Sequence, residues 1–198
     1  MVDEQQSERT PPSRVRVSGL QEAQLQALEE LDAACAAMYY AIGFDGAAVP
    51  VNRAADFAHL TREHTVHVAE ADHVVAGYVA WRDEPPGVAY VAELAVHPDL
   101  QRFGVATKLL ETVRGEARSA RLTHLVARCW EKAPWAWGFY KKLGFAPIDA
   151  QAPARVQAWV AARAEGGRPL TRPGEQIVWA AVGSAWDDAP TTGGGGDD

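Results

Sequence analysis

The sequence predicts an α/β fold in which helices flank a mostly antiparallel, mixed β-sheet. Segments of strand length, rich in valine and alternating in polarity, are separated by turns that contain glycine or proline. Between them lie longer segments whose apolar residues recur every three or four positions, as on one buried face of a helix. The expected order is β-α-α-β-β-β-α-β-α-β-α-β, and 198 residues are most consistent with one domain.

The first half of the chain predicts three strands and two helices. Val15 and Val17 alternate with arginines, which is typical of a short strand at a sheet edge. A long helix follows, and we expect it to end at Gly43 because glycine favours the position after a helix. The expected elements are this helix with the buried stripe Leu28, Leu31, Cys35, Met38 and Ile42, a helix over Arg53–Leu60, and strands Thr65–Glu70 and Val74–Arg82 joined by a turn at Ala71–His73.

The second half is organised around a strand expected over Val88–Val96. Pro98 ends it, because proline cannot donate a hydrogen bond to the next strand. The helix expected at 154–164 could cover one mouth of a site or pad the sheet, and we expect padding. The other elements are a helix from Ala106 with buried Leu109, Leu110, Val113 and Ala117, strand His124–Trp130, a helix from Pro134 to Gly144, strand Phe145–Ile148, helix Ala154–Ala164 and strand Ile177–Val182.

Composition limits the possible partners. A net charge of −7 argues against nucleic acid and leaves room for a cationic partner. Cys35 and Cys129 lack metal-binding spacing and indicate buried thiols in a reducing compartment. The N-terminus lacks the apolar region of a signal peptide, and the longest uncharged apolar run, Ala33–Phe44, is shorter than the roughly 20 residues of a membrane span. We expect a cytoplasmic monomer or homodimer with no membrane association, comprising a disordered lead (1–13), one domain (14–186) and a disordered Gly/Asp tail (187–198).

The segment after the central strand has the features of an anion site. From Leu100 to Leu110 there is no acidic residue, although acids are common in the first turn of a helix. Arg102 and Lys108 add positive charge, and Gly104 lets the backbone approach a ligand. This pattern suits a phosphate held by backbone amides, while the alternative is a solvated helix start with an ordinary turn glycine. Neither a Walker A motif nor a dinucleotide fingerprint is present.

Two motifs resemble those of the GNAT superfamily of N-acetyltransferases. Val96-His97-Pro98-Asp99-Leu100-Gln101-Arg102-Phe103-Gly104-Val105-Ala106 is similar to the family's acetyl-CoA signature. Ala136-Trp137-Gly138-Phe139-Tyr140-Lys141-Lys142-Leu143-Gly144-Phe145 resembles its second, helix-to-strand motif. The two occur in the family's order, and the resemblance covers roughly residues 14–183. It implies a GNAT-like fold and transfer of an acetyl group from acetyl-CoA, as co-substrate, to an amine.

The resemblance also implies roles for individual residues. The central strand is expected to diverge from its neighbour, so that the Leu94 and Val96 backbone pairs with the pantetheine chain and the Val96 amide stabilises the oxyanion. The side chains of these strand residues are core in either case. The expected cofactor-binding residues are Leu94, Ala95, Val96, Gln101, Arg102, Phe103, Gly104, Val105, Ala106 and Thr107.

The resemblance implies a tyrosine as general acid and a carboxylate as general base. Tyr140 matches the tyrosine placed near the sulfur, and its alternative role is a buried core aromatic. Glu93 lies where the strand is expected to diverge, and its alternative role is a half-exposed strand residue. Glu131 and His97 are rival bases. Ala133 stands where the family often has asparagine, which puts in doubt the cofactor contact of that asparagine.

For two further groups of residues we expect structural rather than functional roles. His59, His64 and His67 lack a completing ligand at a known spacing, so we expect no metal site. The tryptophans Trp130, Trp135 and Trp137 are expected to be core residues rather than a ligand platform.

The leading hypothesis is an acetyl-CoA-dependent N-acetyltransferase. Transfer of a longer acyl group and a catalytically silent acyl-CoA-binding module are the alternatives. In the family, acceptor choice comes mainly from the first two helices and their loop, here Met38–Leu60. Its aromatic residues and acids favour a small cationic amine, with a peptide N-terminus or a lysine side chain as the alternative acceptor. The residues concerned are Tyr39, Tyr40, Phe44, Asp45 and Asp56.

Overall fold

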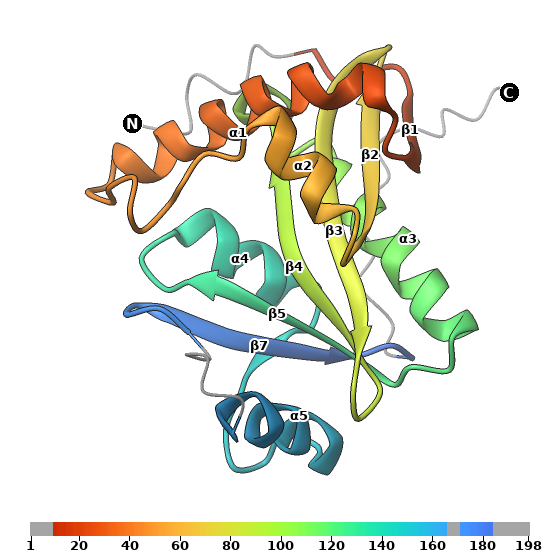
Figure 1. The fold of residues 1–198 in the computed structure, drawn as a ribbon, viewed down its shortest axis with the longest axis vertical. Helices are drawn as coiled ribbons and strands as arrows, with labels where there is room; N and C mark the ends of the chain where they lie inside the picture. The colour runs from red at the N-terminus through yellow and green to blue at the C-terminus, as the bar shows by residue number, and fades with distance from the viewer. Residues whose placement is uncertain (1–9, 166–170, 184–198) are drawn as a thin grey trace, which may run out of the picture.

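The computed structural model describes residues 10–165 and 171–183. They form a seven-stranded sheet in the order β1-β2-β3-β4-β5-β7-β6, with helices on both faces (Figure 1). Every pairing is antiparallel except that of β4 with β5, which is parallel. The strands are β1 Val15–Gly19, β2 Thr65–Ala71, β3 Val74–Glu84, β4 Val88–Val96, β5 His124–Trp130, β6 Ala146–Pro147 and β7 Glu175–Ala181. The helices are α1 Leu25–Tyr40, α2 Ala54–Leu60, α3 Val105–Ser119, α4 Pro134–Lys142 and α5 Ala154–Glu165, with short 3-10 helices η1 Glu22–Gln24 and η2 Pro98–Leu100.

The predicted fold class and order of elements are confirmed, and β4 and β5 have the predicted bounds. The strand expected over Phe145–Ile148 is shorter: β6 comprises Ala146 and Pro147, and one further backbone hydrogen bond runs from the Ile148 amide to the Ile177 carbonyl of β7 at 3.0 Å. Because amides alternate sides along a strand, the Pro147 nitrogen lies on the outer side of this edge strand, where no partner needs a donor. Of the expected disordered lead (1–13) and tail (187–198), residues 1–9 and 187–198 lie outside the described residues, whereas Ser13 is hydrogen-bonded to Asp72.

The buried stripe of α1 differs from the prediction. Leu28 and Leu31 are buried as expected, but the stripe continues through Asp32 and Ala36, and Cys35 and Met38 are only partly buried. Ile42 is 42% exposed and lies beyond the helix, which ends at Tyr40. The last turns of α1 extend past β4, toward the side on which α4 lies (Figure 1). Periodicity alone cannot show where a helix leaves the sheet.

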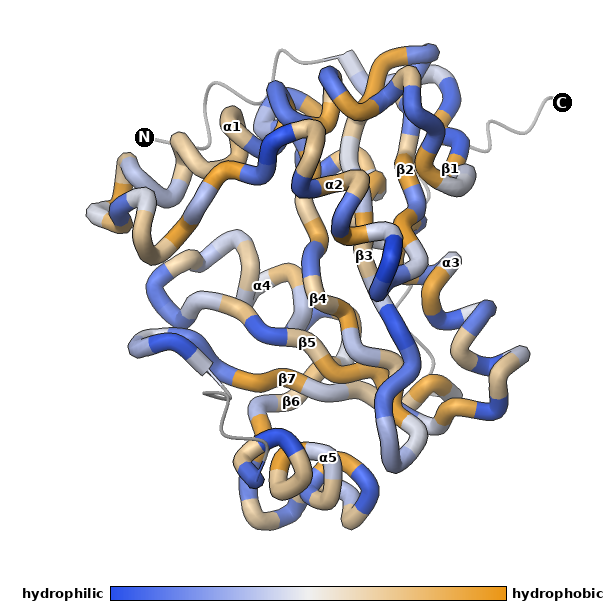
Figure 2. Tube along the Cα trace, in the orientation of Figure 1, coloured by the Kyte–Doolittle hydropathy of each residue, from blue (hydrophilic) through white to orange (hydrophobic). Residues whose placement is uncertain are grey.

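The helices divide the core between the two faces of the sheet. On one face, α3 and α4 cover a cluster that includes Val79, Val91 and Leu109. On the other face, α1 and α2 cover the Tyr78 and Ala80 side chains, and α5 covers Val88 and Tyr90. Figure 2 shows apolar and polar residues alternating along α3, which buries one side. The α5 helix therefore pads the sheet, as expected for residues 154–164.

The two central strands separate halfway along β4. Their pairing ends at Val91 and Ala127, and the rest of β5 pairs only with β7. At the same level the register between β3 and β4 shifts, because Trp81 lies opposite Val91 but Ala80 lies opposite Glu93. The additional residue, Ala92, is a β-bulge, a feature that bends a strand and increases its twist. The bulge directs the end of β4 away from β5.

The close approach of β3 and β4 at Gly77 generates the first prediction. A Cβ at this position would lie 2.6 Å from the Ala95 carbonyl oxygen and 3.0 Å from Val96 Cγ2. We expect Gly77→Ala to lower the free energy of unfolding by about 1–3 kcal/mol, the usual cost of overpacking. The matched control is Gly115→Ala in α3, where a Cβ meets nothing within 4 Å and replacing a helix glycine should stabilise slightly. Urea unfolding of both variants measures the difference, and equal stabilities would contradict the packing account.

Candidate active site

The end of β4 presents backbone amides to the gap between β4 and β5. The His97 amide donates to the Ala76 carbonyl on β3 at 2.8 Å. Because amides alternate sides along a strand, the Ala95 amide points toward β3 and the Leu94 and Val96 amides point toward the gap. The Val96 carbonyl closes the end of this edge, where it accepts hydrogen bonds from Gln101 Nε2 at 3.1 Å and Cys35 Sγ at 3.3 Å. The edge is thus suited to pairing with an extended ligand.

The loop from Gln101 to Gly104 leads directly from this edge into α3. Gly104 is the N-cap residue of α3, with φ of 79°, and Arg102 has φ of 70°. No side chain caps the helix, and its first turn contains no acid. Helix N-termini of this kind bind anions through their unpaired amides. Lys108, expected to add charge here, instead donates from Nζ to the Val15 carbonyl on β1 at 2.7 Å.

The side chains of the predicted loop residues contribute little to this N-terminus. Val105 is 1% exposed in the core, and Ala106 packs partly against the same cluster. Phe103 and Thr107 are partly buried, while Arg102 is exposed. Any role of residues 101–107 in anion binding therefore belongs mainly to their backbone.

Glu93 lies at the start of the gap, on the face covered by α1 and α2. It is opposite Ala80, and directly paired residues of antiparallel strands share a face. Its Oε2 accepts hydrogen bonds from Tyr78 Oη at 2.8 Å and from Asn52 Nδ2 at 2.9 Å. Burial raises the pKa of the Glu93 carboxyl, and the nearby Asp32 raises it further. Glu93 is therefore a mostly enclosed strand glutamate whose carboxylate is held by two side-chain hydrogen bonds.

Asp32 and Tyr78 complete a polar group that the sequence did not predict. Tyr78 Oη also lies 2.8 Å from Asp32 Oδ1, and the Asn52 amide donates to Asp32 Oδ2 at 2.7 Å. Asp32 is 9% exposed and Tyr78 is 1% exposed. The only sequence signal was an acid at a helical position next to Leu28 and Leu31, which is easily taken for the polar edge of the helix.

Tyr140 lies on the opposite face of the sheet. It is 5% exposed, and its ring contacts Phe145 and Phe139 at centroid distances of 5.0 and 5.4 Å. Burial raises the pKa of its phenol well above the usual value, with further contributions from Cys129 on β5 and Tyr39 on α1. These two neighbours place the Tyr140 side chain beside the part of β5 that has left β4. The sheet thus separates Glu93 from Tyr140.

Comparison with known proteins identifies this arrangement. The family model described as "Acetyltransferase (GNAT) family" matches residues 25–145, more than half of the chain. The chain belongs to the GNAT acetyltransferase family. It is therefore an acyltransferase, as the two sequence motifs implied. No curated protein matches the sequence.

Solved structures share the GNAT fold at low identity. The PaiA N-acetyltransferase from Thermoplasma acidophilum, in complex with coenzyme A, has a TM-score of 0.66 and 13% identity, over 85% of this chain and 99% of that one. An acetyltransferase from Streptococcus agalactiae has 0.64 and 15%, over 85% and 99%. The ribosomal-protein-S18-alanine N-acetyltransferase from Escherichia coli has 0.60 and 17%, over 89% and 99%.

Four aromatic residues gather at the end of β5 that has separated from β4. The Tyr39 ring lies 5.3 Å from Trp135 and 5.6 Å from Phe44, and Phe44 lies 4.7 Å from Trp130. All four are partly buried. Tyr40 points elsewhere and donates to the Val49 carbonyl at 2.7 Å. Trp130 and Trp135, expected to be core residues, instead form an edge-to-face cluster with α1 and its loop, here called the aromatic cluster (Tyr39, Phe44, Trp130, Trp135).

The rival bases lie in other settings. His97 Nδ1 accepts a hydrogen bond from the Asp99 amide at 3.3 Å, which ties it to η2. Glu131 is exposed beyond the end of β5. Ala133, in place of the family's asparagine, is fully buried at the N-cap of α4, which has no side-chain cap. Glu93 is the candidate held at the gap by a hydrogen-bond network.

The histidines are distributed over separate contacts. His67 Nε2 lies 2.8 Å from Glu116 Oε2 of α3, and His64 Nδ1 lies 3.3 Å from the Leu60 carbonyl. His59 is in the last turn of α2 and exposed. Within residues 10–165 and 171–183, no group of three or more potential metal ligands gathers. In the same ranges, no helix has the length and apolar character to cross a membrane.

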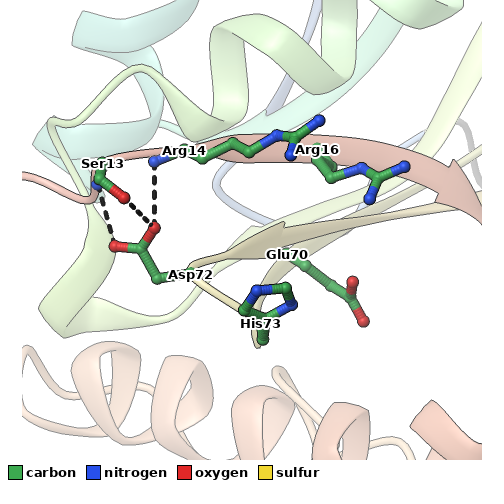
Figure 3. A pocket seen from close by; sticks show the side chains of 6 residues that line it. All are labelled: Ser13, Arg14, Arg16, Glu70, Asp72 and His73. Atoms are coloured by element: carbon green, nitrogen blue, oxygen red, sulfur yellow. Dashed lines mark hydrogen bonds between the residues drawn. The ribbon is translucent and has the colours of Figure 1, made fainter.

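A hollow lies at the β1–β2 edge of the sheet (Figure 3). Its polar groups largely satisfy one another, because the Asp72 carboxylate accepts hydrogen bonds from Ser13 Oγ, the Ser13 amide and the Arg14 amide at 2.6–3.1 Å. These bonds lower the pKa of Asp72. Arg16 and Glu70 lie opposite each other along its other side. The hollow joins the chain near Ser13 to the β2–β3 turn and contains no catalytic arrangement.

The helix start generates the second prediction. A Cβ at Gly104 would point into open space, so Gly104→Glu should fold while placing a side chain and a negative charge at the N-terminus of α3. We expect it to abolish the binding of acetyl-CoA in calorimetry, because the site is suited to phosphate. The matched control is Gly144→Glu, where φ is also positive, at 73°, and the space is also open. Equal loss of binding in both variants, or binding by Gly104→Glu, would contradict the role of the loop.

Proposed function

We propose that this acetyltransferase transfers an acetyl group from acetyl-CoA to a primary amine by direct attack of the amine, with Glu93 as general base and Tyr140 as general acid. The observation that carries the proposal is the gap between β4 and β5, which has a hydrogen-bonded carboxylate on one face and a buried phenol on the other. An amine and a thioester can meet in such a gap from opposite faces of the sheet. Deprotonation of the nucleophile and protonation of the leaving group then occur in separate environments.

The backbone of β4 and of the loop fits acetyl-CoA as the co-substrate. The amides of Leu94 and Val96 face the gap and are suited to pairing with the pantetheine chain, as a strand pairs with a sheet edge. The amides at the start of α3 are suited to the pyrophosphate. We infer that the Val96 amide stabilises the negative charge that develops on the carbonyl oxygen during attack. The Ala95 amide points toward β3, so Ala95 contributes to the pairing that holds β4 in register with β3.

Glu93 supplies a base of appropriate strength. An acceptor ammonium group with a pKa near 10 must lose a proton before it attacks. A carboxyl whose pKa burial has raised accepts that proton more readily than an ordinary glutamate. Both donors contact Oε2, and no described residue donates to Oε1, which is thus available to the amine or to a bridging water.

Tyr140 supplies a proton that burial keeps in place. Its raised pKa keeps the phenol protonated at neutral pH but makes it a weaker acid. In water, transfer from phenol to thiolate is uphill by about 2 kcal/mol. Burial also raises the pKa of the neighbouring Cys129 thiol, to about 11, so a thiolate departing here is a stronger base as well. The stronger base offsets part of the rise in the phenol's pKa, and we infer that the proton transfer is concerted with departure of the thiolate.

The acid role generates the third prediction. Tyr140→Phe should lower kcat by about 10- to 1,000-fold with little change in KM for acetyl-CoA, as expected for a lost general acid. The matched control is Tyr90→Phe, another buried tyrosine, whose ring packs against Trp159 at 5.5 Å. Steady-state kinetics at matched folded concentration measures both. If Tyr140→Phe loses stability while its turnover per folded molecule holds, Tyr140 is a core aromatic only.

The aromatic cluster supports a small cationic amine as the acceptor. Aromatic faces attract ammonium groups, and these four lie at the entrance on the α1 side. The expected acids contribute less, because Asp45 Oδ1 accepts from the Ala47 and Ala48 amides and Asp56 Oδ2 accepts from the Arg53 amide. Charge pairing with the amine therefore belongs chiefly to Glu93.

Arg128 favours a second class of acceptor. It follows Val126 by two residues on β5, so it lies on the same face as Glu93, past the point where the strands separate. Its Nη1 lies 3.5 Å from Glu175 Oε2, while its Nε is buried and has no hydrogen-bond partner among the described residues. A guanidinium donor of this kind suits an acceptor that also carries a carboxylate, such as an amino acid. The Escherichia coli structure is named for a ribosomal-protein alanine, so peptide N-termini remain an alternative class of acceptor.

An acetyl-CoA turnover screen tests the proposal. The panel comprises polyamines, amino acids, aminoglycosides and peptides, each at several concentrations, with release of free thiol as the readout. We expect turnover with small amines and little with aminoglycosides. A preference for peptides alone would overturn the acceptor proposal and leave the catalytic one. Tight binding of acetyl-CoA without transfer to any amine would indicate a silent acyl-CoA-binding module.

A further inference from the structure

We propose that Asp32, acting through Tyr78, receives the proton that Glu93 takes from the amine, so that the three side chains form a proton relay. The inference rests on the proposed function of Glu93 and extends it to two residues of the hydrogen-bond network beneath it. Asp32 and Tyr78 are positioning residues, because they act through Glu93 rather than on the substrate.

The relay is a closed ring of hydrogen bonds. Tyr78 Oη lies 2.8 Å from Asp32 Oδ1 and 2.8 Å from Glu93 Oε2. Asn52 closes the other side, with its amide on Asp32 Oδ2 at 2.7 Å and its Nδ2 on Glu93 Oε2 at 2.9 Å. The ring joins α1, β3, β4 and the segment before α2, and the Phe57 ring packs against Tyr78 at 5.0 Å. Such a ring fixes each oxygen for transfer to the next.

A count of protons shows why the ring can transfer one. A phenol carries a single proton and can donate it to one acceptor at a time. Here two carboxyl oxygens lie at equal hydrogen-bond distance from the same hydroxyl. If the phenol donates to one carboxylate, the second contact is satisfied only when the other carboxyl carries a proton and donates it to the phenol oxygen. The geometry therefore suits one additional proton shared between Asp32 and Glu93.

The surrounding charges favour this shared state. Burial raises the pKa of Asp32 and of Glu93, and each negative charge disfavours ionisation of the other. Cys35 on α1 stays a neutral thiol, because burial raises its pKa to about 12. Arg128 on β5 is the nearby positive charge, and it lowers the pKa of Glu93. On the α2 side, Asn52 and Phe57 are uncharged.

The transfer balances without any further reactant. An N–H bond of the acceptor ammonium breaks as an O–H bond forms on Glu93. That proton then passes from Glu93 to the Tyr78 oxygen while the original phenol proton passes to Asp32. One proton has moved from the amine to Asp32, Glu93 is again a carboxylate, and no electrons are exchanged. Asp32, at 9% exposure beside the partly buried Asn52, then releases the proton to water.

Two variants and one control test the relay. In Asp32→Asn the like charge is lost and the phenol donates to Glu93 alone, so the pKa of Glu93 should fall. In Tyr78→Phe the hydroxyl that stabilises the carboxylate is lost, so the pKa of Glu93 should rise. Tyr90→Phe should leave it unchanged. The fourth prediction is that side-chain ¹³C NMR titration of the folded proteins, with no substrate, shows these opposite shifts.

The fifth prediction concerns the rates of the same variants. The acid limb of kcat/KM against pH should move to lower pH in Asp32→Asn and to higher pH in Tyr78→Phe, following Glu93. On the alkaline plateau both variants should lose about 10- to 100-fold in kcat, because the relay is interrupted, with KM for acetyl-CoA unchanged. A merely structural role would not move the two limbs in opposite directions.

Three outcomes separate the possibilities. If Glu93 titrates at the same pH in all variants, the proposal that Asp32 and Glu93 share a proton is wrong. If the titrations shift but plateau rates hold, Asp32 does not receive the proton. If the titrations shift in opposite directions while the unchanged chain acetylates no amine, the proposed function fails and the shared proton stands. Thermal unfolding of each variant verifies that a folded protein is compared.

Discussion

The separation of β4 from β5 is the constraint on which the rest of the site depends. Parallel pairing that continued past Val91 would occupy the backbone groups of Leu94 and Val96. A single additional residue in the strand, Ala92, prevents this by shifting the register against β3 and bending β4 away. The antiparallel pairing with β3 continues beyond the bulge, so the edge is open on one side and held on the other. Backbone groups of β4 can therefore stay unpaired toward β5 while the pairing with β3 holds the strand in place.

The same separation leaves the proposed base and the proposed acid on different faces of one sheet. The bulge also determines the face of the sheet on which Glu93 lies. It puts Glu93 opposite Ala80, on the face covered by α1 and α2. Tyr140 comes from α4 on the other face and stays in an apolar environment with Phe139 and Phe145. Glu93 is surrounded by polar donors and Tyr140 by aromatic rings. Burial raises the pKa values of both groups, which suits the proposed base, since it must bind a proton, and the proposed acid, since it must retain one until attack.

Local sequence signals predicted the parts of the fold that depend on neighbours along the chain. Pro98 marks the end of β4, and Gly104 marks a helix start without a side-chain cap. The hydrogen-bond network beneath Glu93 could not be predicted in this way, because Asp32 and Tyr78 are 46 residues apart and meet only when α1 crosses β3. In the sequence, Asp32 is one acid among several on α1. The exposure of Ile42 was missed for a related reason, since the helix period continues where the sheet beneath it does not.

Amide hydrogen exchange along β4 tests the open edge most directly. Exchange is followed for Leu94, Ala95 and Val96 with and without acetyl-CoA. The account predicts that Leu94 and Val96 exchange at least about tenfold more slowly with the ligand, the scale of one added hydrogen bond, while Ala95, already directed toward β3, changes little. Equal slowing at all three positions, or none at Leu94 and Val96, would contradict the claim that this edge of β4 binds the co-substrate.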